Sequence, residues 1–67
     1  MKMHILDTEN NVEVSDTDIL MKKAGLNVGM GFEGIGLQDD ATPVVFDRCG
    51  GFGYLDSNEY RVVIEFD

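Results

Sequence analysis

The chain has 67 residues, with 13 Asp and Glu against 5 Lys and Arg, and its formal net charge at pH 7 is -8. This charge disfavours nucleic acid and anionic membranes as direct partners and favours basic protein surfaces. Because 43% of the residues are hydrophobic and in mixed order, we expect one folded domain over residues 1–67 rather than a disordered chain. The single Cys49 excludes an internal disulfide and fits a cytoplasmic location, and no apolar run approaches the roughly 20 residues of a membrane span.

The N-terminal segment is predicted to form a β-hairpin. Residues 2–6 have strand character, and residues 12–14 alternate apolar and acidic side chains. Turn-forming residues occupy positions 7–11 between them. The pattern therefore predicts two short strands joined by a turn.

One short helix is predicted over residues 16–24. Ser15 or Asp16 can cap its N-terminus, and Gly25 supplies the left-handed residue that ends it. A helix of about nine residues is not stable alone in water. We therefore expect it to pack on a sheet through Ile19, Leu20 and Ala24.

The glycine-rich segment from Gly25 to Gly36 is compatible with a bent strand, a bulge or a loop. Strands are predicted after it at residues 42–47, 52–55 and 59–66, arranged as a C-terminal meander. The last strand has one apolar face, which carries Tyr60, Val62, Ile64 and Phe66. Together these elements predict an α+β fold, a small antiparallel sheet or partly open barrel of about five strands with one short helix.

Residues 29–34 match the dinucleotide-binding spacing G-x-G-x-x-G. In that motif the glycines follow a strand and open a helix whose N-terminal amides bind pyrophosphate. Here they follow the predicted helix and lead into Gly36-Leu37, and Glu33 would repel phosphate. We therefore expect no bound cofactor.

Metal binding and catalysis are not expected. Residues 7–18 imitate a calcium-binding loop, but Val12 replaces the required glycine and Asp18 replaces the bidentate Glu. His4 and Cys49 are too few for a structural zinc site, and nothing in the sequence brings them together as a nucleophilic pair. The chain is therefore predicted not to be an enzyme.

The segment from Asp7 to Gly29 resembles in local shape the swapped hairpin of AbrB-type transition regulators and antitoxins. The resemblance covers about a third of the chain and includes the turn, the short strand, the helix and residues 25–29. Those families carry basic residues on their DNA-facing loops, whereas this chain has Asn11 and Asp16 there. The resemblance implies an antitoxin or AbrB-like regulator, which we keep as the second alternative.

The sequence favours a small acidic protein-binding module of the kind that phages and mobile elements use as inhibitors. Its carboxylates would imitate the phosphates of DNA and occupy a basic surface of a larger protein, such as a nucleic-acid-binding enzyme. The first candidate face lies on the last strand and its neighbours and comprises Asp47, Asp56, Glu59, Glu65 and Asp67. A second candidate patch comprises Asp39 and Asp40.

The first alternative is a self-assembling or accessory structural subunit. The glycine-rich segment carries Met30, Phe32 and Ile35, which would supply apolar contacts to a second chain. Small domains often gain stability from such association, so a homodimer is left open.

Overall fold

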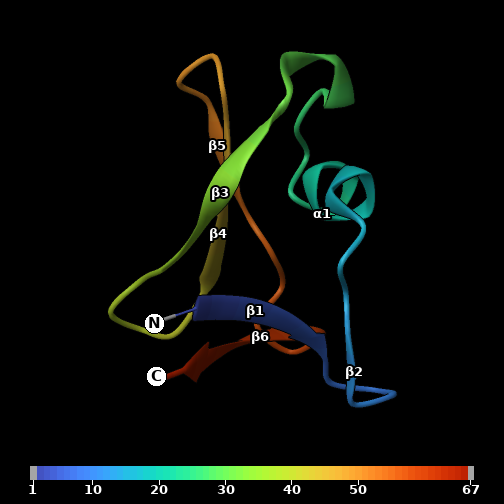
Figure 1. Ribbon diagram of the computed structural model, residues 1–67, viewed down its shortest axis with the longest axis vertical. Helices are drawn as coiled ribbons and strands as arrows, with labels where there is room; N and C mark the ends of the chain where they lie inside the picture. The colour runs from blue at the N-terminus through green and yellow to red at the C-terminus, as the bar shows by residue number, and fades with distance from the viewer. Residues whose placement is uncertain (1, 67) are drawn as a thin grey trace.

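The computed structural model describes residues 2–66 as two antiparallel three-stranded sheets and one short helix (Figure 1). The first sheet has the order β2-β1-β6, with strands at Val12–Glu13, Lys2–Asp7 and Tyr60–Glu65. The second has the order β3-β4-β5, with strands at Phe32–Leu37, Pro43–Asp47 and Phe52–Tyr54. Helix α1 covers Thr17–Lys23. The predicted mixed α+β fold with one short helix is confirmed, with the strands divided between two sheets that do not close.

The predicted N-terminal hairpin is formed by β1 and β2, with Leu6 opposite Glu13. Asp7 holds the turn in two ways. Its backbone carbonyl accepts a hydrogen bond from the Asn11 N–H at 2.8 Å, and its Oδ1 accepts one from the Glu9 N–H at 2.8 Å. Asn11 has φ 56°, a left-handed conformation that Asn tolerates better than most residues.

Helix α1 begins after Asp16, whose side chain accepts a hydrogen bond from the Asp18 N–H at 3.0 Å. Asp16 is therefore the N-cap, of the two residues considered from the sequence. The predicted end is also confirmed, because Gly25 has φ 78°. None of the helices in residues 2–66 combines the length and the apolar character that crossing a membrane requires.

The buried face of α1 differs from the predicted one at a single position. Leu20 is buried and Ala24 packs against the core, as expected, but Ile19 is 44% exposed. Met21 is buried in its place. Residues three and four apart share a helix face, so the face that contains Leu20 and Ala24 includes Met21 and excludes Ile19.

Residues 25–38, which the sequence leaves open between strand and loop, contain both. A 3-10 turn covers Val28–Met30, and strand β3 follows with a bulge between Phe32 and Gly34. The G-x-G-x-x-G spacing therefore runs from this turn into a strand. Because it opens no helix, it lacks the N-terminal amides that the dinucleotide motif needs.

The core lies between the two sheets and the helix. It is formed by buried side chains from both sheets, the helix and the β5–β6 connection: Ile5, Leu20, Met21, Val45, Leu55 and Tyr60. Burial of each such side chain contributes about 1.5–3 kcal/mol. The two sheets and the helix therefore depend on one another for stability.

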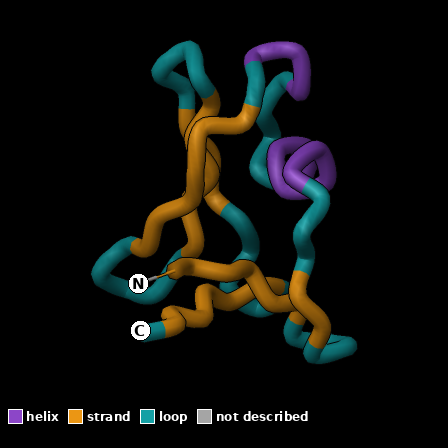
Figure 2. The backbone as a smooth tube through the Cα atoms, in the orientation of Figure 1, coloured by secondary structure: helices purple, strands orange, loops and turns teal. Residues whose placement is uncertain are grey.

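The predicted C-terminal meander is wrong for its last strand. β4 and β5 pair as expected, but β6 pairs with β1 in the other sheet, with Asp7 opposite Tyr60 and Lys2 opposite Glu65. Between β5 and β6 the side chain of Leu55 is only 2% exposed. The chain thus crosses from one sheet to the other by way of the core, and the strands of the two sheets cross (Figure 2). The apolar face of β6 is confirmed for Tyr60, which is 8% exposed, and for the half-buried Val62 and Ile64. It is wrong for Phe66, which lies beyond the end of β6 and is 77% exposed.

Candidate functional site

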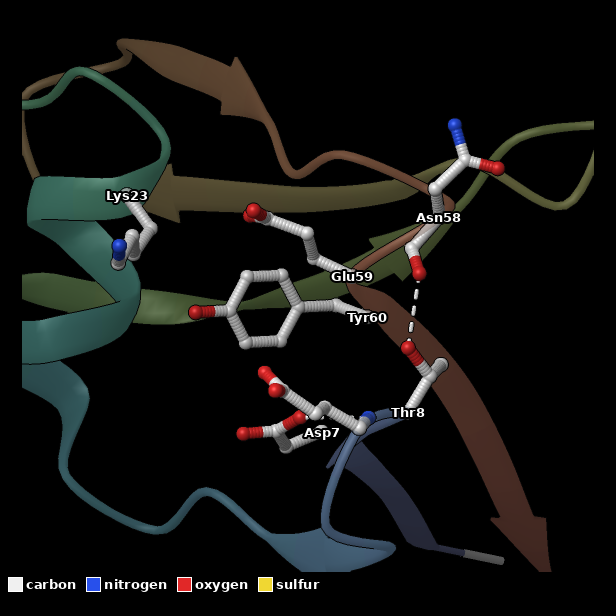
Figure 3. A pocket seen from close by; sticks show the side chains of 7 residues that line it. Asp7, Thr8, Lys23, Asn58, Glu59 and Tyr60 are labelled. Carbon is white, nitrogen blue, oxygen red and sulfur yellow. Dashed lines mark hydrogen bonds between the residues drawn. The ribbon is translucent and has the colours of Figure 1, made fainter.

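Two turns that are far apart in sequence meet at one end of the first sheet. The backbone N–H of Thr8, in the β1–β2 turn, donates a hydrogen bond to the Glu59 carbonyl at 2.9 Å. The Thr8 hydroxyl donates a second to the Asn58 carbonyl at 2.8 Å (Figure 3). These bonds fix the turn before β6 against the turn after β1.

A cavity of about 310 Å³ lies at this junction, and we call it the acidic pocket. Three of its lining residues are the acids Asp7, Glu9 and Glu59, whereas Lys23 is the only base among the described residues that line it. Figure 3 shows the Tyr60 ring between the side chains of Asp7 and Glu59, with its hydroxyl pointing toward the helix. The pocket thus has an excess of negative charge and borders the largely buried Tyr60 side chain.

Local hydrogen bonds orient the acids at this junction. Asp7 is half-buried and is held by the Glu9 N–H, as described above. Asp56 is exposed, and its Oδ1 accepts a hydrogen bond from the Asn58 N–H at 2.8 Å. The Asp56 carbonyl also accepts hydrogen bonds from the N–H groups of Glu59 and Tyr60 at 3.0 and 2.9 Å. The turn that carries Glu59 is therefore well defined.

This arrangement fits an organic cation better than a metal ion. Among residues 2–66, no three His, Cys, Asp or Glu side chains are arranged to hold a metal ion. The imitation of a calcium loop at residues 7–18 is instead a hairpin turn, a short strand and the start of α1. Carboxylates around a partly enclosed hollow are suited to an ammonium or guanidinium group, with which they form charge-assisted hydrogen bonds.

Asp47 does not belong to an exposed acidic face. Its side chain is turned inward on β4 and is only 7% exposed. Its Oδ1 accepts hydrogen bonds from the N–H groups of Cys49 and Gly51 at 2.8 and 2.7 Å. The carboxylate thus holds the β4–β5 turn and is not available to a partner.

The other acids of the predicted face are dispersed. Glu59 lies in the acidic pocket, and Asp56 is exposed in the adjacent turn. Glu65 lies at the far end of β6, about 20 Å from Glu59 at the usual rise of a strand. Asp67 lies outside the described residues. The predicted set therefore does not form a single patch in residues 2–66.

Glu65 takes part in a separate cluster around His4, which connects all three strands of the first sheet. The His4 Nε2 lies 3.0 Å from Glu65 Oε2, and its Nδ1 lies 2.9 Å from Glu13 Oε1. Cys49 is in the β4–β5 turn of the other sheet, where its Sγ lies 3.8 Å from the Met30 carbonyl oxygen. The structure thus does not pair His4 with Cys49.

Asp39 and Asp40 form a second exposed patch in the β3–β4 connection. Hydrogen bonding by the Thr42 side chain, followed by its backbone N–H, holds the pKa of Asp40 below its usual value. The Thr42 N–H lies 3.1 Å from the Asp40 Oδ1. Asp40 is therefore a fixed, ionised carboxylate at neutral pH.

The sequence interpretation missed Asp7 and Glu9, which line the pocket together with Glu59. Both are in the predicted hairpin turn, where the sequence suggests turn residues or an imperfect calcium loop but no partner-binding role. The signal that places them opposite Glu59 is the pairing of β1 with β6, which joins residues more than 50 positions apart. Periodicity within each strand contains no such information.

Similarity to known proteins does not identify the pocket. No protein-family model, curated protein or solved structure matches the chain. A proposal for its function therefore rests on the geometry and charges of its own residues.

Proposed function

We propose that this protein is a small binding module whose acidic pocket accepts a Lys or Arg side chain from a basic surface of a larger protein. The observation that carries the proposal is the convergence of Asp7, Glu9 and Glu59 on one cavity. A guanidinium or ammonium group entering the cavity would form charge-assisted hydrogen bonds with these carboxylates.

The overall charge supports the same function. A net charge of -8 on 67 residues attracts a basic partner over several ångströms and accelerates its encounter. Asp56 lies beside the pocket, whereas Asp39, Asp40 and Glu65 are exposed elsewhere and add to the field. Fixed carboxylates compete with phosphates for Lys and Arg side chains, so a nucleic-acid-binding enzyme is the partner class that we propose. A phage or mobile-element inhibitor would act in this way.

The proposed activity is binding without a catalytic step. Both ring nitrogens of His4 are engaged by carboxylates, at 2.9 and 3.0 Å, and Cys49 is in the other sheet. A nucleophile and its base need to be within hydrogen-bond distance of each other. These positions support a binding role over an enzymatic one.

The two alternatives have less support. Self-assembly through the glycine-rich segment requires its apolar side chains to be free, but Phe32 and Ile35 pack against the core. Of the three proposed contact residues only Met30 is exposed, at 45%. An AbrB-like regulator requires basic loops, and this chain has Asn11 and Asp16 at the corresponding positions. We therefore retain the binding module as the proposed function.

The proposal can be tested by titrating the isotope-labelled protein with an arginine-rich peptide and following its backbone amides by NMR. We expect shifts at the β1–β2 turn and at residues 58–60, and an affinity that falls steeply with ionic strength. Glu59→Gln should weaken binding several-fold. Glu33→Gln is the matched control, because Glu33 is exposed on β3 and does not line the pocket.

Equal losses in the two variants would show that only net charge matters and would overturn the pocket as the site. A protein pull-down from the native host, with the Glu59→Gln variant as control, would then test the partner class. Recovery of acidic rather than basic proteins would contradict charge as the basis of recognition.

A further inference from the structure

The outward face of the second sheet carries three aromatic side chains on two adjacent strands. Phe46 of β4 lies opposite Phe52 of β5, with ring centroids 6.4 Å apart. Tyr54 follows on β5, and its ring meets that of Phe52 edge to face at 5.7 Å. The three side chains are 41%, 55% and 49% exposed, in the order Phe46, Phe52, Tyr54. An exposed apolar patch of a few hundred Å² is often a binding surface in a small protein.

The neighbouring strand leaves room beside these rings. Gly34 and Gly36 of β3 lie opposite Phe46 and Val44, so β3 has no side chain on this face at either position. A Cβ at Gly36 would come within 2.9 Å of the Phe46 ring. The Phe46 ring therefore lies over Gly36 of β3. A cavity of about 330 Å³ borders both residues. We call this the aromatic groove.

Negative charge lies beside the groove rather than in it. No charged side chain of the described residues lines the groove itself. Gln38 lines it at one end and also lines an adjoining hollow with Asp39 and Asp40. None of the described bases lines either hollow. A ligand that fills both hollows must therefore combine an apolar part with a positive charge.

We propose that the aromatic groove binds an extended, proline-containing peptide segment whose neighbouring Lys or Arg lies against Asp39 and Asp40. Proline-rich segments are pre-ordered and dock in aromatic-lined grooves. The Tyr54 hydroxyl and the Gln38 amide are the polar groups available to the peptide backbone. The groove shares no lining residue with the acidic pocket, so this second site goes beyond the function proposed above.

A second copy of the chain fits the groove less well. With roughly 200 Å² for each aromatic side chain and half of it exposed, the three rings offer about 300 Å². A stable interface buries about 800 Å² on each partner. Single-stranded nucleic acid also stacks on aromatic residues, but the carboxylates of Asp39 and Asp40 would repel its phosphates.

The test is an NMR titration with a synthetic peptide that has proline and leucine in its centre and arginine at one end. We expect amide shifts at Phe46, Phe52 and Tyr54, and a loss of affinity of about tenfold in Phe52→Ala, a typical effect for an aromatic anchor. Phe52→Tyr should restore binding. Phe66→Ala is the matched control, because Phe66 is 77% exposed and does not line the groove. Circular dichroism of each variant checks that the fold is kept.

One further peptide and one double variant of the protein test the chemistry of the ligand. Replacing arginine by glutamate should abolish binding, and Asp39→Asn with Asp40→Asn should reduce the preference for arginine. The proposal is overturned if Phe52→Ala and Phe66→Ala bind alike, if the glutamate peptide binds equally well, or if the shifts fall outside the groove. It is also overturned if sedimentation shows a dimer that Phe52→Ala dissociates. Glu59→Gln alters the acidic pocket and leaves the groove unchanged. A negative result for peptide binding in the groove is therefore distinguishable from a negative result for cation binding in the acidic pocket.

Discussion

Gly53 of β5 lies directly against the backbone carbonyl of Ala24 at the end of helix α1, so a side chain at Gly53 would collide with the helix backbone. The position that would hold a Cβ is 3.1 Å from the Ala24 Cβ as well. This contact sets how closely the helix approaches the second sheet.

We expect Gly53→Ala to destabilise the protein by about 1–3 kcal/mol or more, because backbone atoms cannot move aside as a flexible side chain can. Gly34→Ala is the control, since a Cβ there meets no atom within 4 Å. Chemical denaturation of both variants measures the difference. Equal stability would show that the helix can shift without cost.

Asp47→Ala should cost about 1–3 kcal/mol in the free energy of unfolding, because the N–H groups of Cys49 and Gly51 lose their acceptor. Asp47→Asn should cost less, since both hydrogen bonds end on the same oxygen and an amide oxygen can accept them. Urea denaturation at neutral pH provides the comparison. If the two variants are equally unstable, the negative charge rather than the acceptor is what the turn requires.

The Asp40 carboxyl predicts a pH dependence of stability. Its pKa is lowered in the folded state by Thr42, so the folded protein binds this proton less readily than the unfolded chain does. The stabilisation is therefore present above the unfolded pKa of about 3.9 and is lost as the pH falls through the lowered folded value. Thr42→Val should return the pKa of Asp40 toward its usual value in an NMR titration. An unchanged pKa in that variant would contradict the assigned cause.

The contacts of His4 with Glu13 and Glu65 should contribute little. Their carboxylate side chains are 52% and 64% exposed, so water and salt screen the interaction. Double-mutant cycles of His4→Ala with Glu13→Gln and with Glu65→Gln are expected to give coupling energies below about 1 kcal/mol that shrink with added salt. A larger, salt-independent coupling would show that the cluster is more shielded than its exposure indicates.

Lys23 partly neutralises the acidic pocket. Lys23→Met should therefore strengthen binding of an arginine-rich peptide by about two- to fivefold, as expected for one exposed charge. Lys22→Met is the control, because Lys22 is in the same last turn of α1 but does not line the pocket. An equal gain in both variants would mean that the peptide responds to total charge alone.

The sequence predicted the elements well because each is defined by local chemistry. The alternation in β6 over residues 60–64, the cap at Asp16 and the stop at Gly25 depend on near neighbours and are confirmed. The division into two sheets was missed. The residues between β5 and β6 were interpreted as a hairpin turn, but the burial of Leu55 carries the chain into the other sheet.

The candidate site was predicted only in part for the same reason. Glu59 and Asp56 were identified from the acidic composition, whereas Asp7 and Glu9 become their neighbours only through the pairing of β1 with β6. Asp47 was assigned to the acidic face, but its carboxylate accepts hydrogen bonds from the backbone of the β4–β5 turn. A carboxylate next to a glycine-rich turn can bind either the local backbone or a partner. Composition alone does not distinguish the two uses.

The pairing of Lys2 with Glu65 joins the two ends of the described chain in one sheet, which affects how the protein folds. Without β6, the first sheet would be a two-stranded ribbon, which is marginal in water. Joining segments so distant along the chain has a large entropic cost before any contact forms, so this small protein should fold slowly for its size. Until β6 has paired, the backbone edge of β1 that it covers stays open to strands of other molecules.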